Sequence, residues 1–263
     1  MNDVISDNMN EEVLVLIPAR LASTRLENKP LADIAGKPMI VHVWEKAMQA
    51  GIGRVVVAAA EQAICDAVTA AGGEAVLTDP DLPSGSDRIH EALETIDPQA
   101  RYRIIVNLQG DLPTLDPQLV RRVSRLIDRQ TDMATLVAQI SDAAEDVNPN
   151  VVKAVVAWDN DTKTSDMKIG KALYFTRATA PHGDGPRYHH IGIYAYRREA
   201  LQRFVSLPPS PLEQREKLEQ LRALEAGMVI AVSCVDTIPL GVDTPEDLQT
   251  ARTLLADSDG NGG

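Results

Sequence analysis

The chain has 263 residues, a formal net charge of −12, 44% hydrophobic residues and 24% charged residues. This length allows one large α/β domain or two smaller ones, and the composition is that of an ordinary globular protein. The acidic balance excludes a generic nucleic-acid-binding protein, because such proteins take most of their affinity from cationic contacts with phosphates. An anionic substrate would need a local basic pocket, helped by a divalent metal ion.

Neither the cysteines nor the hydropathy pattern points to a secreted or membrane protein. Cys65 and Cys234 stand far apart and are interpreted as small buried apolar residues. No apolar run approaches the roughly 18 residues that span a membrane. Residues 1–12 are polar and acidic and lack the order of a signal peptide. We therefore predict a cytoplasmic protein with a disordered leader over residues 1–12 and a disordered tail over residues 257–263.

In the first half of the chain, predicted strands alternate with predicted helices. Apolar runs predict strands over residues 13–17, 54–60, 74–78 and 104–108, and helices are predicted over residues 38–50, 61–71 and 86–96. This alternation indicates right-handed βαβ units and an α/β fold with a doubly wound, mostly parallel, Rossmann-like sheet. Ligands bind such sheets beyond the carboxyl ends of the strands, where this chain has Pro18–Arg20 and Gln109–Asp111.

The second half of the chain is richer in strands. Strands are predicted over residues 133–140, 151–157, 171–177, 189–197 and 229–235, with no helix between the first two and a polar turn over residues 159–166. One charge-laced helix is predicted over residues 213–226, ending at Gly227, and another begins at Thr244 and Pro245. We therefore predict one domain over residues 13–256 that contains a smaller β-rich subdomain around residues 165–236.

The loop that follows the first strand is basic. It contains three cations that could neutralise a triphosphate: Arg20, Arg25 and Lys29. Its small residues would let backbone N–H groups approach a phosphate: Ala19, Ala22 and Ser23. The alternative is a solvated surface loop with incidental charge, and charge alone does not separate the two. The loop has no glycine between Pro18 and Pro30, which excludes a dinucleotide-binding fingerprint, and Gly36-Lys37-Pro38 is not a P-loop.

Two aspartates are candidate ligands for a metal ion that would bind near this loop. Asp111 follows Gly110 directly after the fourth predicted strand, and Asp243 precedes the last helix. Mg²⁺ takes one or two carboxylates together with phosphate oxygens. Asp243 alone is better explained as a helix cap, but the two carboxylates together predict a magnesium pair.

Taken together, these stretches closely resemble the 3-deoxy-D-manno-octulosonate (Kdo) cytidylyltransferases, the CMP-Kdo synthetases of lipopolysaccharide assembly. The resemblance covers nearly the whole chain from Val13 to about Leu255, and its combination of motifs is highly specific. The matching segments are IPARLASTRLENKPL (17–31), GKPMIVHVWEKA (36–47), SGSDR (84–88), NLQGDLP (107–113), NPNVVK (148–153), ALYFTRATAP (172–181), HHIGIYAY (189–196), SPLEQREKLEQLRALEAG (210–227) and GVDTPEDL (241–248).

The resemblance implies roles for particular residues. Nucleotide-binding residues would be Ala19, Arg20, Ser23, Arg25, Lys29, Ser84, Gly85, Arg88 and Gln109. Kdo-binding residues would be Gln109, Arg177, His190, Tyr194, Glu219 and Gln220, with Arg177 suited to the sugar's carboxylate. Asp111 and Asp243 would bind Mg²⁺ and, with Arg20 and Lys29, form the catalytic set. From the residues alone, His190 is better explained as a satisfied or surface histidine, and Glu219 and Gln220 as solvated helix residues.

These motifs depart from the family pattern at two places. The familiar loop has Pro-Gly where this chain has Glu27-Asn28, and the Gln-Gly-Asp motif is often followed by Glu-Pro where this chain has Leu112-Pro113. Neither removes a proposed ligand. Glu27 nevertheless adds a negative charge beside the expected phosphate site.

The resemblance implies a homodimeric, magnesium-dependent enzyme that transfers CMP from CTP to the anomeric hydroxyl of Kdo and releases pyrophosphate. A cytidylyltransferase for another sugar acid, such as an amino-Kdo analogue or sialic acid, is the nearest alternative. An inactive nucleotide-binding module is the alternative from another class of protein. No nucleic acid or membrane insertion is expected.

Overall fold

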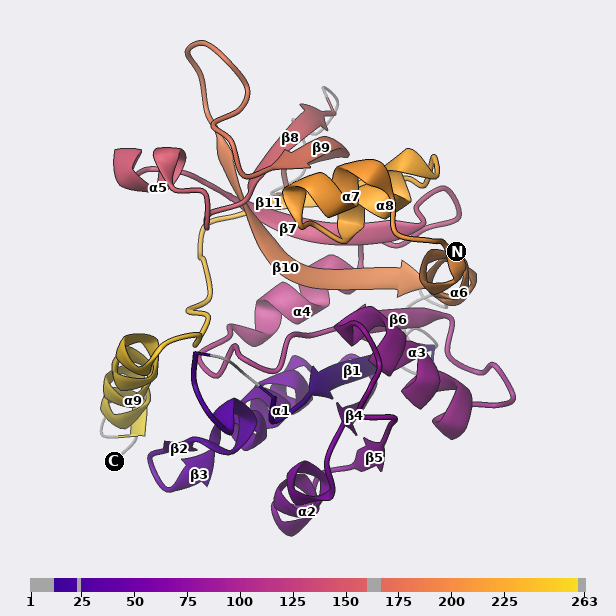
Figure 1. Cartoon of the computed structure of the whole chain (residues 1–263), viewed down its shortest axis with the longest axis vertical. Coiled ribbons are helices and arrows are strands. Elements are labelled where there is room, and N and C mark those ends of the chain that lie inside the picture. Colours follow the sequence, from indigo (N-terminus) through magenta and orange to yellow (C-terminus); the bar gives the residue numbers. More distant parts are fainter. Residues whose placement is uncertain (1–11, 23–24, 160–166, 260–263) are drawn as a thin grey trace, which may run out of the picture. The chain divides into compact units, whose positions relative to one another are not determined.

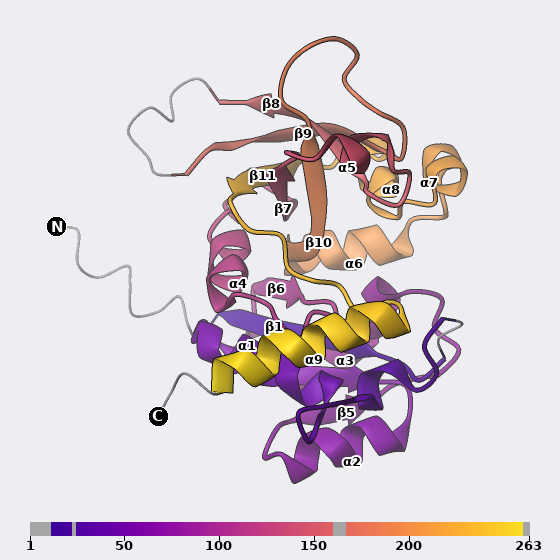
Figure 2. The ribbon, with the colours of Figure 1, turned by 90° about the vertical axis from the view of Figure 1, so that its left-hand side faces the viewer.

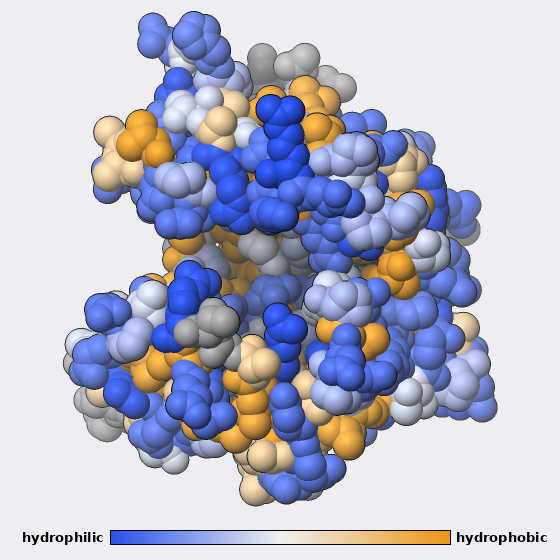
Figure 3. All heavy atoms as spheres, viewed as in Figure 1, coloured by the Kyte–Doolittle hydropathy of each residue, from blue (hydrophilic) through white to orange (hydrophobic). Residues whose placement is uncertain are grey.

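The computed structural model of the chain describes residues 12–22, 25–159 and 167–259. The chain divides into two compact units: unit 1 comprises Met1–Arg121 and Pro239–Gly263, and unit 2 comprises Arg122–Ile238. Among the described helices, none is both long and apolar enough to cross a membrane. The face in Figure 3 is mostly hydrophilic on both units, and its hydrophobic residues form small separate groups.

Unit 1 is built on parallel strands in the order β5-β4-β1-β6 (Figure 1). Their bounds are β1 (Val13–Ala19), β4 (Arg54–Ala59), β5 (Ala75–Leu77) and β6 (Ile104–Asn107). Six of the seven β1 residues are buried, because helices and loops cover both faces of a parallel sheet. These strands confirm the four predicted from apolar runs.

The helices of unit 1 connect and flank these strands. They are α1 (Met39–Ala50), α2 (Gln62–Ala70), α3 (Gly85–Ile96) and α9 (Pro245–Asp259), together with the 3-10 turn η1 (Lys29–Leu31) and the short strands β2 (Asp33–Ile34) and β3 (Lys37–Pro38). Helices α1, α2 and α3 lie where the sequence predicted them. Helix α9 has 15 residues and extends to Asp259. Residues 257–259 are therefore helical, although the sequence analysis assigned them to a disordered tail. Helix α4 (Pro117–Ser124) was not predicted.

Unit 2 contains strands in the order β10-β7-β11-β9-β8. Their bounds are β7 (Met133–Gln139), β8 (Lys153–Trp158), β9 (Ile169–Thr176), β10 (Tyr188–Arg197) and β11 (Ile230–Val235). Strand β7 pairs in parallel with β11, and the other pairings are antiparallel. The fold is therefore a mixed α/β fold. The expected mostly parallel sheet holds within unit 1, and unit 2 is rich in strands, as the second half of the sequence predicted, with mostly antiparallel pairings.

The helices of unit 2 correct two further predictions. They are α5 (Ala143–Val147), α6 (Arg198–Ser206), α7 (Pro211–Glu216) and α8 (Gln220–Glu225). Helix α5 lies between β7 and β8, where none was expected, and the Asp142 side chain caps it by accepting a hydrogen bond from the Ala144 N–H. The single helix predicted over residues 213–226 is two helices, because Lys217 adopts a left-handed conformation with φ of 58° that ends α7.

The extent of unit 2 also differs from the predicted subdomain. It begins at Arg122 rather than near residue 165, because β7 pairs with both β10 and β11 and belongs to the same sheet. The polar turn predicted over residues 159–166 lies outside the described residues, apart from Asp159.

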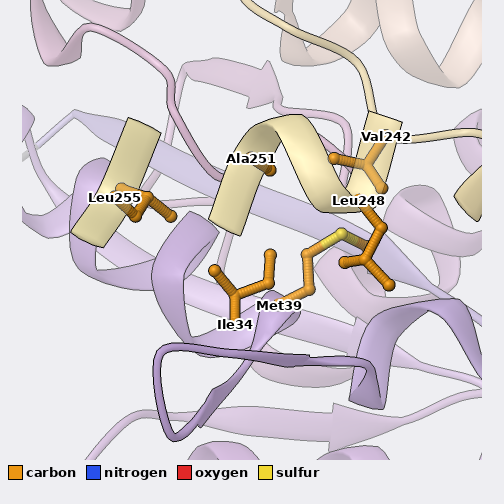
Figure 4. Packing of buried hydrophobic residues seen from close by; sticks show 6 residues of the cluster. All are labelled: Ile34, Met39, Val242, Leu248, Ala251 and Leu255. Atoms are coloured by element: carbon orange, nitrogen blue, oxygen red, sulfur yellow. The ribbon is translucent and has the colours of Figure 1, made fainter. Parts of the chain in front are cut away.

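A hydrophobic cluster fixes the end of the chain to the beginning of unit 1. Val242, Leu248 and Leu255 pack with Ile34 and Met39, and Figure 4 shows these labelled side chains grouped between α9 and the start of α1. The Arg252 side chain adds a hydrogen bond to the Asp33 carbonyl. Burial of several aliphatic side chains contributes on the order of 1.5–3 kcal/mol each, enough to anchor the Val242–Asp243 segment.

Replacing Leu248 tests this anchoring. We expect Leu248→Ala to lower the free energy of unfolding by about 2–4 kcal/mol, because it removes a side chain that is 7% exposed and leaves a cavity. Leu254→Ala on the same helix is the control, since Leu254 is 50% exposed and should cost less than about 1 kcal/mol. Urea unfolding of the three proteins measures the difference, and equal losses would contradict the proposed anchor.

Candidate active site

A pocket of about 400 Å³ lies in unit 1 at the carboxyl ends of β1 and β6. In register, Leu16 of β1 pairs with Asn107 of β6, so the segments that follow the two strands emerge side by side. The pocket-lining residues include most of the predicted nucleotide-site residues: Ala19, Arg20, Arg25, Lys29, Ser84, Gly85, Arg88, Gln109 and Asp111. Ser23 lies outside the described residues.

Lys29 connects the basic loop to both predicted metal ligands. Its Nζ lies 2.8 Å from Asp111 Oδ2 and 3.0 Å from Asp243 Oδ1. Burial alone would lower the pKa of Lys29, but the attraction and hydrogen bonds of the two carboxylates outweigh it and raise the pKa. The two aspartates therefore surround one cation-binding position, and Lys29 is charged there.

Asp243 is not the cap of α9. The cap is a reciprocal pair in which the Asp247 N–H donates to Thr244 Oγ1 and the Asp247 carboxylate accepts from the Thr244 N–H. A backbone hydrogen bond from the Val242 N–H to the Asp111 carbonyl then holds the segment beside Asp111. The Asp243 side chain is left to pair with Lys29 and with Arg25, whose Nη2 lies 3.1 Å from Asp243 Oδ2.

The other loop cation, Arg20, is exposed at the pocket and forms no ion pair among the described residues. Its guanidinium is available to an anionic ligand. Glu61 holds the beginning of the loop, because its carboxylate accepts a hydrogen bond of 2.9 Å from the Leu21 N–H. The arrangement is thus an anchored loop with cations at an open pocket.

Helix α3 forms the side of the pocket across from this loop. Ser84 caps the helix by accepting from the Asp87 N–H, and its hydroxyl donates to the Asp87 carboxylate. Arg88 is 2% exposed, and its Nη1 donates to Thr78 Oγ1 and to the Asp79 carbonyl. Burial lowers the pKa of Arg88. Arg88 therefore shapes the pocket by fixing the 78–80 segment.

Two glycines allow close packing at the floor of the pocket. A Cβ on Gly110 would lie 2.9 Å from the Pro18 carbonyl oxygen, and one on Gly85 would lie 3.3 Å from Pro18 Cγ. The first distance is shorter than a Cβ tolerates against backbone, so only glycine lets the Gln109–Asp111 segment approach β1 this closely.

In unit 2, Arg177 is part of a backbone network. Its Nε donates to the Glu216 carbonyl, its Nη1 to the Pro149 carbonyl and its Nη2, at 3.4 Å, to the Lys217 carbonyl. A guanidinium has five N–H groups. Three are used here, which leaves one on each terminal nitrogen for a ligand such as a carboxylate.

His190 and Tyr194 lie next to each other on β10. The centroids of their rings are 5.5 Å apart, and Phe175 contacts His190 edge-on. Burial, with a smaller contribution from His189, lowers the pKa of His190 to about 3. Burial also raises the pKa of Tyr194. Both side chains are therefore neutral near pH 7 and can act only as hydrogen-bonding groups.

Glu219 and Gln220 stand at the start of α8. The expectation that both are solvated is wrong for Gln220, which is 6% exposed because it points into the unit rather than outward. Its Nε2 has no hydrogen-bond partner among the described residues. A buried amide without a partner costs about 1–3 kcal/mol, so this nitrogen is suited to binding a ligand oxygen.

Two ionic groups that sequence reasoning missed, one buried and one half-buried, support this region. Lys153 is fully buried, and its Nζ donates to the carbonyls of Asn148 and Val151 and, at 3.4 Å, of Arg177. Glu216 accepts hydrogen bonds from Thr176 Oγ1 and from the Arg177 N–H. A lysine within an otherwise apolar strand was the available signal for the first. Glu216 is indistinguishable in sequence from the surface charges around it.

The chain is similar to known proteins over most of its length. The family model described as "Cytidylyltransferase" matches residues 14–230. A 3-deoxy-manno-octulosonate cytidylyltransferase of Parvibaculum lavamentivorans is 64% identical over 244 residues, 92% of each chain. One of Paramagnetospirillum magneticum is 59% identical over 243 residues, 92% of this chain and 97% of that one.

The chain belongs to the 3-deoxy-manno-octulosonate cytidylyltransferase family. A solved structure of CMP:2-keto-3-deoxy-manno-octonic acid synthetase complexed with CTP also matches, with a TM-score of 0.85 and 40% identity. That match covers 94% of this chain and 99% of the other. A nucleotidyl transferase from Methanothermobacter thermautotroptrophicus has a TM-score of 0.57 at 14% identity and shows the fold alone.

The backbone accounts for one departure from the pattern of the 3-deoxy-manno-octulosonate cytidylyltransferases. Asn28 has φ of 52° and ψ of 33°, a left-handed conformation that glycine and asparagine adopt more readily than other residues. Asparagine in place of the family's glycine therefore preserves the turn before η1. Glu27 is exposed and is not among the residues that line the pocket, so its charge lies outside that lining.

The low pKa of His190 predicts a pH-dependent stability. Its pKa is lower in the fold than the ordinary 6.5, so the unfolded chain binds more protons between pH 6.5 and about 3. The free energy of unfolding therefore falls as the pH falls through this range. From about pH 7 to about pH 5, we expect the wild type to lose about 1–2 kcal/mol more than His190→Gln in urea unfolding. Parallel losses in the two proteins would show that His190 is not buried as described.

Proposed function

We propose that this chain transfers CMP from CTP to the anomeric hydroxyl of 3-deoxy-D-manno-octulosonate, giving CMP-Kdo and pyrophosphate for lipopolysaccharide biosynthesis. The observation that carries the proposal is the pocket at the ends of β1 and β6, which Arg20, Arg25 and Lys29 line and in which Lys29 pairs with the carboxylates of Asp111 and Asp243. The named relatives, 59–64% identical over nine-tenths of the chain, support the same reaction.

The nucleotide would bind in the pocket of unit 1. Arg20 and Arg25 are exposed and can form charge-assisted hydrogen bonds with phosphate oxygens, and Lys29 supplies a third positive charge. Ala19, Ser84 and Gly85 leave room for the nucleoside, and Arg88 keeps the adjoining 78–80 segment in place. The loop cations would neutralise the charge that develops on the departing pyrophosphate.

Asp111 and Asp243 fit a magnesium ion. Their oxygens lie within 2.8–3.0 Å of one cationic nitrogen, so they already surround a position for positive charge. Among the described residues, no group of three or more histidines, cysteines, aspartates and glutamates is placed to hold a metal. The remaining ligands would therefore be phosphate oxygens and water, as Mg²⁺ prefers. When bound, the ion would polarise the α-phosphate and neutralise charge.

The acceptor sugar would contact residues of unit 2. Arg177 has one uncommitted N–H on each terminal nitrogen, which matches the two oxygens of the sugar's carboxylate. His190 and Tyr194 are neutral near pH 7 and can bind hydroxyl groups, as can the buried Gln220 amide and the Glu219 carboxylate. The chain would accelerate the reaction through positioning and charge neutralisation.

We also infer a cytoplasmic homodimer in which unit 2 contributes both the sugar contacts and the contact between subunits. The family resemblance motivates this inference, and size-exclusion chromatography with light scattering tests it.

A screen of acceptor acids tests the function. We expect pyrophosphate release from CTP and Mg²⁺ with Kdo, and much slower release with an amino-Kdo analogue or with sialic acid. A preference for another acid would replace Kdo as the substrate while keeping the reaction. No release with any acid, from a folded protein, would favour an inactive nucleotide-binding module.

The two aspartates provide a residue-level prediction. We expect Asp111→Asn and Asp243→Asn each to lower kcat at least about 100-fold at saturating CTP and Kdo, because each removes a charge that holds the metal ion and Lys29. Asp33→Asn, an exposed carboxylate of the same unit, is the control and should change kcat less than about twofold. An unchanged kcat in either aspartate variant would show that this residue does not bind the metal ion.

A further inference from the structure

A buried hydroxyl lies beneath the His190 ring at an irregularity in β10. Along β10, Ile191 pairs with Leu136 and Tyr194 pairs with Thr135, so two residues of β10, Gly192 and Ile193, are extra at this step. This bulge shortens the separation of His190 and Tyr194. Four residues of regular strand span about 13 Å, whereas the two ring centroids lie 5.5 Å apart.

Thr135 closes the bulge from the neighbouring strand β7. It is fully buried, and its Oγ1 lies 3.0 Å from the Ile191 carbonyl oxygen and 2.9 Å from the Ile193 carbonyl oxygen. The same Oγ1 lies 3.1 Å from His190 Nε2. One hydroxyl therefore contacts the carbonyl just before the bulge, a carbonyl within the bulge and one nitrogen of the ring.

The proton on this hydroxyl has a defined place. Carbonyl oxygens only accept hydrogen bonds, and a hydroxyl has one proton to donate. If Thr135 donated to His190 Nε2, its lone pairs would face two carbonyl oxygens at about 3 Å with no proton between them. Donation to one carbonyl, or a proton shared between the two, lessens this repulsion. His190 Nε2 must then be the donor to Thr135 Oγ1.

A neutral imidazole carries one N–H, and the other nitrogen is an acceptor. The His190 ring is neutral near pH 7, because burial strongly disfavours its charged form. With the proton on Nε2, Nδ1 presents a lone pair. No described residue of unit 2 makes a hydrogen bond with Nδ1, so this lone pair remains for a ligand.

We propose that Thr135 is a positioning residue that fixes the Nε2–H tautomer of His190 and so makes Nδ1 an acceptor for a sugar hydroxyl. The inference rests on the proposed function, because it assumes that His190 contacts the acceptor sugar. It assigns the direction of that contact: the sugar donates, and the ring accepts. A site with an acceptor at this point would discriminate against an analogue that lacks the hydroxyl, since the Nδ1 lone pair would then be buried without a partner.

The tautomer can be measured without reference to activity. In 15N-histidine-labelled protein, the ring resonances distinguish a protonated from an unprotonated nitrogen, and the signals lost in His190→Gln identify His190 among the five histidines. We expect Nε2 protonated and Nδ1 unprotonated in the wild type at neutral pH. A wild-type ring with its proton on Nδ1 would overturn the proposal.

Substitutions at Thr135 test whether this residue causes the tautomer. Thr135→Val keeps the shape but removes the acceptor, so we expect the His190 resonances to shift toward the Nδ1–H form. Thr135→Ser should restore the wild-type pattern. Ser233→Ala is the control, because Ser233 is an equally buried hydroxyl of the same sheet that bonds Arg122 and not His190. Unchanged His190 resonances in folded Thr135→Val would refute the role of Thr135.

Kinetics supply a second readout. We expect Thr135→Val to raise KM for Kdo about tenfold, the loss of about one hydrogen bond, with KM for CTP unchanged. An equal rise in both constants would indicate a general structural defect and contradict the proposal. The proposed substrate and the proposed tautomer can be tested separately. A wild type that does not use Kdo would contradict the proposed substrate, whereas the His190 resonances report on the tautomer in either case.

Discussion

The ammonium of Lys29 between Asp111 and Asp243 is the interaction on which the geometry of unit 1 depends. The three residues come from segments 82 and 214 positions apart along the chain. Two carboxylates placed this close repel each other unless a cation lies between them. The lysine provides that cation and is itself held in its charged form by them. The pocket therefore presents both signs of charge, two carboxylates and an ammonium.

An ion pair at a partly open pocket contributes little net stability, so other contacts must bring its members together. The cluster of Ile34, Met39, Val242 and Leu248 does this by burying apolar surface on either side of the Asp243 segment (Figure 4). The Val242 N–H then sets the distance to Asp111 through one backbone hydrogen bond. Hydrophobic burial thus supplies the energy, and the polar contacts set the geometry.

The sequence predicts unit 1 better than unit 2 for a physical reason. Strands buried on both faces are continuous apolar runs, and their helices have clear ends, so β1, β4 and α3 follow from local pattern. The left-handed Lys217 that divides α7 from α8 has no comparable signal, because lysine ordinarily continues a helix. The burial of Gln220 also depends on tertiary packing. Polar residues that point inward look like solvated ones in a sequence.

The same limit applies to the candidate site. Motifs reveal residues whose chemistry is unusual for their place, such as the loop cations of an acidic chain. They do not reveal the residues that orient them. Glu216, Lys153 and Thr135 act through backbone carbonyls and N–H groups that belong to distant segments. Any sequence can supply a carbonyl, so no residue pattern marks the partners of these side chains. Lys153 alone gives a signal, as a lysine within an apolar strand, and only the fold identifies its partners.

The two units differ in the kind of side chains that they offer to a ligand. Unit 1 has several cationic side chains at an open pocket, which suits a phosphate chain whose affinity is electrostatic. Unit 2 has neutral rings, a buried amide and an arginine fixed by three carbonyls, which suits an acceptor defined by the placement of its hydroxyls. Selectivity among sugar acids depends on such groups, because a buried polar atom left without its partner costs more than a lost surface contact. Under the proposed function, the discrimination between acceptors would belong to unit 2, and within it to the groups whose donor or acceptor character the fold fixes.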